Sequence, residues 1–138
     1  MDESSKTTHN PDHPISTGRK AITICIVIII ALIHILRVGS YLHGTLFTFY
    51  YSYFSDIVIP FGMYFLLYLS EVHIPLLQDW RVKAISVFGI TSSTEIMQAF
   101  GVPILGLTFD PLDFLMFGGG VLLAVIMDRC LLNRLFPY

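Results

Sequence analysis

Residues 21–36 have the sequence AITICIVIIIALIHIL, an almost uninterrupted apolar run that decides the class of this protein. The run continues past Arg37 to about Leu42, which gives a segment long enough to cross a bilayer as a helix. It is too long for the core of a signal peptide, and it lacks a small-residue cleavage site. We therefore expect a retained transmembrane helix over residues 21–42.

The composition of the whole chain supports a membrane location. Of its 138 residues, 54% are hydrophobic and only 13% are charged, a balance that a soluble domain of this size does not show. Eight basic and ten acidic residues leave no basic stripe for nucleic acid. Membrane lipids are the expected partners, nucleic acid is not, and a homo-oligomer is left open.

Three further segments have membrane-spanning length, at about residues 51–69, 82–100 and 111–132. The fold class expected is all-α, a four-helix transmembrane bundle that forms one membrane domain over residues 19–138. Residues 1–18 are polar and lack apolar periodicity, so they are predicted to be a disordered tail. The third helix is the least apolar, and its polar second half predicts a place inside the bundle.

The basic residues predict the orientation of these helices. They precede the first and third helices and close the fourth, whereas the other two connections hold none. Under the positive-inside rule, both termini and the connection between the second and third helices are cytoplasmic. The six residues are Arg19, Lys20, Arg81, Lys83, Arg129 and Arg134.

Several buried polar residues fall in the extracytoplasmic half of this arrangement. A carboxylate at membrane depth costs several kcal/mol unless it is protonated, paired or hydrated, so such residues predict function. Glu95 and Gln98 are three residues apart and share a helix face. We expect one polar pocket, open to the outer face and lined by residues of all four helices: Arg37, Asp56, Glu95, Gln98, Asp110 and Asp113.

Simpler interpretations of these residues stay open. Glu95 could form a structural ion pair with Arg37, Asp110 could only cap the fourth helix, and Asp56 could lie at the surface. Four acids beside one arginine would need a proton, a metal or a substrate amine to balance their charge. The Asp-x-x-Asp spacing of Asp110 and Asp113 is too common to specify a metal, and no metal or cofactor is predicted.

The stretch from Ser93 to Gly120 resembles the VanZ-like family of small integral membrane proteins. That family has a Glu-x-x-Gln pair on one helix and an Asp-x-x-x-Asn-x-x-Gly pattern opening the next. Glu95 and Gln98 match the pair, and Asp113 and Gly120 match the aspartate and the glycine, whereas Phe117 replaces the asparagine. The resemblance implies a multi-pass protein of the bacterial cytoplasmic membrane.

The function expected is recognition of a cell-envelope lipid head group or a cell-wall-linked component. Glu95, Gln98 and Asp113 would be the central contacts, and Arg37, Asp56 and Asp110 would complete the wall. One alternative is a membrane-embedded enzyme with Glu95 and Asp113 as an acid–base pair. Another is a structural assembly subunit with a buried ion pair. Transport is less favoured, because no charged path leads from Glu95 to the cytoplasmic side.

Overall fold

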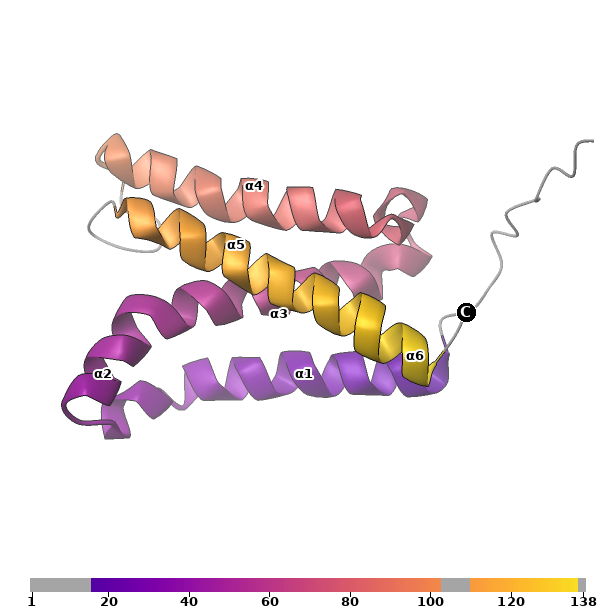
Figure 1. The fold of residues 1–138 in the computed structure, drawn as a ribbon, viewed down its shortest axis with the longest axis horizontal. Helices are drawn as coiled ribbons and strands as arrows, with labels where there is room; N and C mark the ends of the chain where they lie inside the picture. Colours follow the sequence, from indigo (N-terminus) through magenta and orange to yellow (C-terminus); the bar gives the residue numbers. More distant parts are fainter. Residues whose placement is uncertain (1–15, 103–109, 137–138) are drawn as a thin grey trace, which may run out of the picture.

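The computed structural model describes residues 16–102 and 110–136. The described chain is all-α, and each of its four long helical stretches runs antiparallel to the one before it, so that the first and third are parallel, as are the second and fourth (Figure 1). The predicted tail lies almost wholly outside the described residues, although Thr17 and Gly18 already belong to the first helix. The elements are α1 (Thr17–Ile35), η1 (Val38–Tyr41), α2 (Thr45–Phe49), η2 (Tyr50–Phe54), α3 (Ser55–Leu69), η3 (Ser70–Val72), η4 (Pro75–Gln78), α4 (Trp80–Ala99), α5 (Pro111–Ile126), η5 (Met127–Leu132) and α6 (Asn133–Leu135).

The first helix ends earlier than predicted. Helix α1 stops at Ile35, and Arg37 has a φ of 50°, a left-handed conformation that a continuing α-helix does not contain. The expectation of a helix to residue 42 is therefore wrong at its C-terminal end. His34, Arg37 and Tyr41 consequently do not share one helical face, because the chain turns between them.

The second helical stretch is longer than predicted and irregular in its first half. It runs without a break from Thr45 to Val72, through the π-helical turn η2 into α3. Pro60 lies buried inside α3 and has no N–H to donate to the carbonyl of Asp56, one turn earlier. Membrane helices tolerate such a proline when neighbouring helices satisfy the freed backbone group. The carbonyl of Asp56 therefore receives no intrahelical hydrogen bond from position 60.

Helix α3 forms the centre of the bundle, because it packs against α1, α4 and α5. Helices α1 and α4 lie on opposite sides of the α3–α5 pair (Figure 1). The closest approach is at Gly120, where an added Cβ would collide with the backbone carbonyl of Ile57. Ala124, one turn later, is fully buried. The small residues of α5 therefore allow α3 and α5 to pack closely, as such residues do between membrane helices.

Three of the four stretches are long and apolar enough to cross a membrane: Thr17–Ile35, Thr45–Val72 and Pro111–Leu135. Helix α4 has 20 residues, which corresponds to roughly 30 Å, but its composition is more polar. It does not lie inside the bundle as predicted. It packs on one side and buries a single face that holds Lys83, Val87, Thr91 and Glu95 at intervals of four residues.

The described chain begins and ends at the same end of the bundle (Figure 1). Gly18 in α1 lies against the ring of Phe136, which follows α6. An even number of antiparallel helices produces this arrangement. The assignment of that end to the cytoplasm stays a prediction, since it depends on the distribution of basic residues.

Candidate functional site

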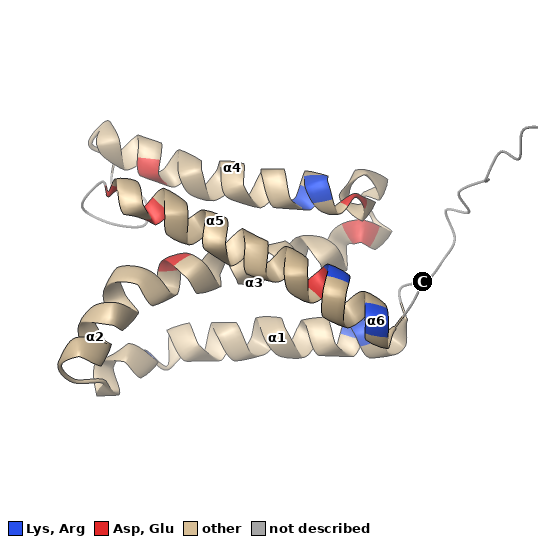
Figure 2. Cartoon of the chain, in the orientation of Figure 1, with Lys and Arg blue, Asp and Glu red and all other residues tan. Residues whose placement is uncertain are grey.

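Three carboxyl groups from three helices meet near the end of the bundle opposite to α6. Asp56 comes from α3, Glu95 from α4 and Asp113 from the first turn of α5 (Figure 2). The three side chains are close enough to interact electrostatically, and they repel one another when ionised. Glu95 is the most deeply buried, with 4% of its surface exposed. We call these residues, together with Asp110, the acidic cluster.

Asp110 both caps α5 and contacts Glu95. Its Oδ1 accepts a hydrogen bond of 2.9 Å from the backbone N–H of Leu112, the arrangement expected of an N-cap. Its own backbone N–H donates to Oε2 of Glu95 over 3.4 Å. Pro111 then occupies the first helical position, where a missing N–H costs nothing. The cap predicted for Asp110 is confirmed, and it brings the start of α5 next to Glu95.

Helix α4 presents Glu95 to the cluster together with other small polar residues. Thr91, one turn earlier, is buried and its hydroxyl donates to the backbone carbonyl of Val87 over 3.0 Å. Ser92 is also buried, and its hydroxyl has no partner among the described residues. Gln98, in the last turn of α4, is partly buried. Thr91 and Ser92 are thus buried together with Glu95 on one face of α4, and Gln98 is partly covered.

Arg37 does not belong to this cluster. It lies exposed in the turn between α1 and η1, and no salt bridge joins it to a carboxylate anywhere in residues 16–102 or 110–136. The ion pair considered between Arg37 and Glu95 is therefore absent from the described structure. The physical reason is the early end of α1, which turns the chain away before Arg37 can point into the bundle.

The acidic cluster therefore has unbalanced charge. No lysine or arginine of the described chain forms a salt bridge with Asp56, Glu95 or Asp113. Carboxyl groups this close in a medium of low dielectric constant cannot all remain ionised unless a cation binds between them. Without a cation, the group of carboxylates shares at least one proton. Within the described residues, no group of three His, Cys, Asp or Glu side chains has the geometry to hold a metal ion.

A second charged cluster lies inside the opposite end of the bundle, and the sequence analysis did not foresee it. Arg19 of α1 pairs with Asp128 of η5, and Lys83 of α4 pairs with Glu71 of η3. Lys83 also lies 4.0 Å from Asp128, which joins the two pairs. All four side chains are at least nine-tenths buried. We call them the ion-pair cluster.

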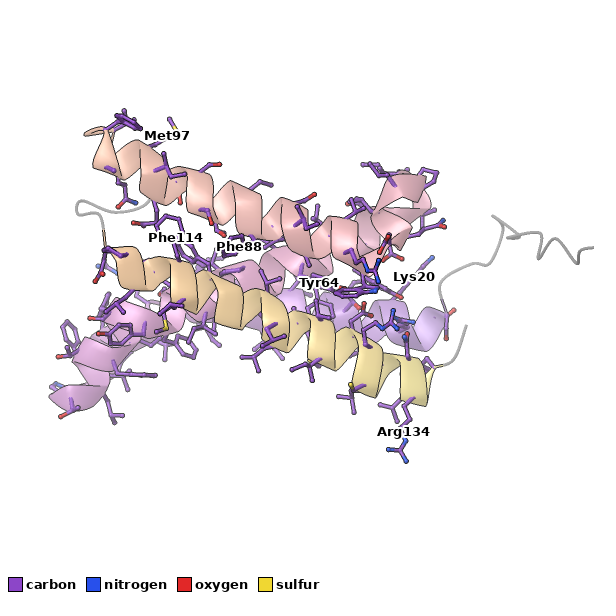
Figure 3. All side chains as sticks on the ribbon, turned by 45° about the horizontal axis from the view of Figure 1, so that its top comes forward. Lys20, Tyr64, Phe88, Met97, Phe114 and Arg134 are labelled. Atoms are coloured by element: carbon purple, nitrogen blue, oxygen red, sulfur yellow. The ribbon has the colours of Figure 1, made fainter. Side chains whose placement is uncertain are left out.

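Two tyrosines of α3 complete the ion-pair cluster. The Tyr64 hydroxyl donates to Oδ2 of Asp128 over 2.8 Å, and Tyr64 lies inside the bundle (Figure 3). Lys83 Nζ lies 5.2 Å from the centre of the Tyr64 ring and 4.9 Å from that of Tyr68. Arg19 also lies over the Tyr68 ring, at 4.9 Å. Each charge is thus compensated by an opposite charge, a hydrogen bond or an aromatic face.

From the sequence alone, Arg19 and Lys83 were predicted only to orient the helices in the membrane. Charge counting treats every basic residue near a helix end as exposed, although a residue there can also turn inward. The spacing of Lys83 and Glu95 gives no sequence signal for the ion-pair cluster, because the two residues are twelve positions apart and differ by about 120° around an ideal helix.

No protein-family model, curated protein or solved structure matches this chain. Its class therefore comes from its own residues and geometry. Three apolar helices long enough to cross a membrane, packed with a fourth around buried charges, make it a helical protein with several candidate membrane spans.

Proposed function

We propose that this protein recognises the positively charged group of a cell-envelope lipid or cell-wall-linked component at the acidic cluster. Glu95 and Asp113 are the central contacts, and Asp56 supports them from α3. Gln98 and the carboxylate of Asp110 lie at the rim, toward the ends of their helices. The class of ligand follows from charge, because a site that holds three carboxyl groups suits an amine.

The observation that carries this proposal is the convergence of Asp56, Glu95 and Asp113 from three different helices without a basic partner in the described structure. A stable bundle does not require these three carboxyl groups, since apolar residues of similar size would pack there without the repulsion. The contrast with the ion-pair cluster is informative. There, two cations balance two carboxylates within the chain itself.

The four-span topology with cytoplasmic termini is part of the proposal. It would place the acidic cluster in the extracytoplasmic half of the bilayer, within reach of envelope components. The resemblance to the VanZ-like family also remains a proposal. It is supported by the positions of the matched residues, since Glu95 and Asp113 lie together and Gly120 packs against α3.

The test is binding of phosphatidylethanolamine, whose head group carries an amine, by native mass spectrometry of the purified protein. Glu95→Gln and Asp113→Asn remove charge and keep side-chain volume. Each should weaken binding about 10-fold to 100-fold, the value of a hydrogen bond to a charged group. Asp79→Asn is the matched control, because Asp79 is an exposed carboxylate at the other end of the bundle and asparagine is an equivalent helix cap.

Three results would contradict the proposal in different ways. Unchanged lipid binding in both variants would exclude the acidic cluster as the lipid site. Loss of folding in Glu95→Gln would show that the cluster serves assembly. Turnover of an amine-containing lipid that stops in Glu95→Gln and Asp113→Asn, while binding persists, would establish the alternative of a membrane-embedded enzyme with an acid–base pair.

A further inference from the structure

The single tryptophan of the chain lies within cation–π distance of two arginines at the end of the bundle that holds α6. Trp80 is the first residue of α4. The guanidinium carbon of Arg81 lies 5.5 Å from the centre of the indole ring, and that of Arg129 in η5 lies at the same distance. Both arginines are exposed. We call Trp80, Arg81 and Arg129 the arginine–tryptophan patch.

The two guanidinium groups of this patch have no anionic partner in the described structure. Neither forms a salt bridge within residues 16–102 or 110–136. Asp79 is the acid nearest to Arg81 in sequence, two positions before it, and its Oδ1 accepts a hydrogen bond of 2.8 Å from the backbone N–H of Arg81. Two like charges over one indole ring repel each other, so this arrangement favours an anion between or beside them.

The position of the patch identifies the kind of anion. Tryptophan side chains concentrate at the level of the lipid head groups, where an apolar ring and a polar N–H are both satisfied. Exposed apolar residues adjoin the patch in sequence, with Ile85 72% exposed on α4 and Leu131 48% exposed on η5. An anion with attached hydrocarbon chains can use both surfaces, whereas a free anion can use only the arginines.

We propose that the arginine–tryptophan patch binds the phosphate of an anionic phospholipid. Arg81 and Arg129 hold the phosphate oxygens, and Trp80 lies at the level of the glycerol backbone. Guanidinium groups suit this role because their N–H donors match phosphate geometry. The patch is separate from the acidic cluster, which lies at the other end of the bundle and takes a group of opposite charge.

Trp80 reports on this site directly, because it is the only tryptophan. The full chain is reconstituted in phosphatidylcholine vesicles that contain increasing amounts of dibrominated phosphatidylglycerol, whose bromines quench indole fluorescence on contact. The proposal predicts stronger quenching than by dibrominated phosphatidylcholine at equal mole fraction. Arg81→Gln and Arg129→Gln should each raise the mole fraction for half-quenching about fivefold, the value of one basic residue at an anionic membrane surface.

Arg134→Gln is the matched control, since Arg134 is exposed at the same end but points away from the bundle (Figure 3). It should leave the preference for phosphatidylglycerol unchanged. Equal quenching of the wild-type protein and the Arg81→Gln/Arg129→Gln double variant would overturn the proposal, provided that circular dichroism shows both folded. So would an equal loss in Arg134→Gln, which would indicate only a diffuse surface potential.

Inorganic phosphate separates a lipid from a soluble ligand. Millimolar phosphate added to pure phosphatidylcholine vesicles should leave the Trp80 emission unchanged and should not displace the brominated phosphatidylglycerol. A shift of the emission by phosphate, with loss of the preference for phosphatidylglycerol, would assign the patch to a soluble anion and overturn the lipid assignment.

Discussion

Asp128 connects more of the bundle than any other single side chain described above. It pairs with Arg19 of α1, lies 4.0 Å from Lys83 of α4 and accepts a hydrogen bond from Tyr64 of α3. Only 3% of its surface is exposed. One carboxylate of η5 therefore contacts a buried polar group from each of three helices. Removal of that carboxylate takes the salt bridge away from the buried Arg19 guanidinium, whereas Lys83 keeps its pair with Glu71.

We predict that Asp128→Asn lowers the free energy of unfolding by about 3–5 kcal/mol, the usual cost of removing one partner of a buried ion pair. The measurement is equilibrium unfolding in detergent micelles, with Asp79→Asn as the exposed control. The double variant Arg19→Leu/Asp128→Leu should be more stable than Asp128→Leu alone, because no buried guanidinium that has lost the Asp128 carboxylate remains. If the double variant is less stable than the single one, Arg19 stabilises the bundle even without Asp128, which contradicts the prediction.

At the scale of elements, the contact of α3 with α5 sets the geometry of the acidic cluster. Gly120 lies against the backbone of Ile57, which is the residue next to Asp56. The same close approach brings Asp56 within range of Asp113, two turns before Gly120 on α5. Any side chain at position 120 must push the two helices apart, and this displacement would separate the carboxyl groups as well.

We therefore predict that Gly120→Ala destabilises the bundle by about 1–3 kcal/mol, the range for overpacking an interior. It should also weaken the ligand binding proposed for the acidic cluster. Gly119→Ala is the control, because no described atom lies within 4 Å of the position of an added Cβ. That variant should be neutral or slightly more stable, since alanine favours helix by up to about 1 kcal/mol. Thermal unfolding of both variants in the same detergent compares them, and equal midpoints would show that α3 and α5 can separate without cost.

At the scale of the whole molecule, charge is distributed unequally between the two ends of the bundle. Most basic residues gather at the end that holds α6, whereas the other end is mainly acidic (Figure 2). Arg19 and Lys83 are neutralised inside the ion-pair cluster, which leaves Arg81, Arg129 and Arg134 exposed there. The positive-inside rule therefore still predicts the same orientation when the buried residues Arg19 and Lys83 are left out of the count of basic residues.

Cysteine labelling in intact cells tests this orientation. The free cysteines Cys25 and Cys130 are first replaced by alanine. We predict that Ser40→Cys, in η1, reacts with a membrane-impermeant maleimide added outside. Ser16→Cys and His73→Cys should react only after the membrane is opened, since both lie at the end predicted to be cytoplasmic. The reverse pattern would invert the topology and place the acidic cluster toward the cytoplasm.

Much of the acidic cluster was predictable from helix periodicity and depth. The pattern of apolar segments predicted four antiparallel helices, which brings residues near matching helix ends to the same level. Glu95 and Asp113 follow from this rule. Arg37 does not follow this rule, because it adopts a left-handed conformation just after the end of α1. The amino-acid composition of the segment does not indicate this change of backbone conformation. Asp56 lies roughly 16 Å from the start of its helical stretch. This depth is greater than predicted, because the stretch begins at Thr45 and the prediction placed its start at about residue 51.

The amino-acid sequence alone determined the membrane class and the all-α fold, because partition into lipid depends on composition along each segment and requires no contact between segments. Only the tertiary structure decided which charged residues pair. Arg19 and Asp128 are 109 positions apart, and their contact depends on how α1 and α5 pack around α3. Rotation of one helix by a fraction of a turn would replace an ion pair with an uncompensated charge. That rotation is set by side-chain packing, as at Gly120, and no single segment encodes it.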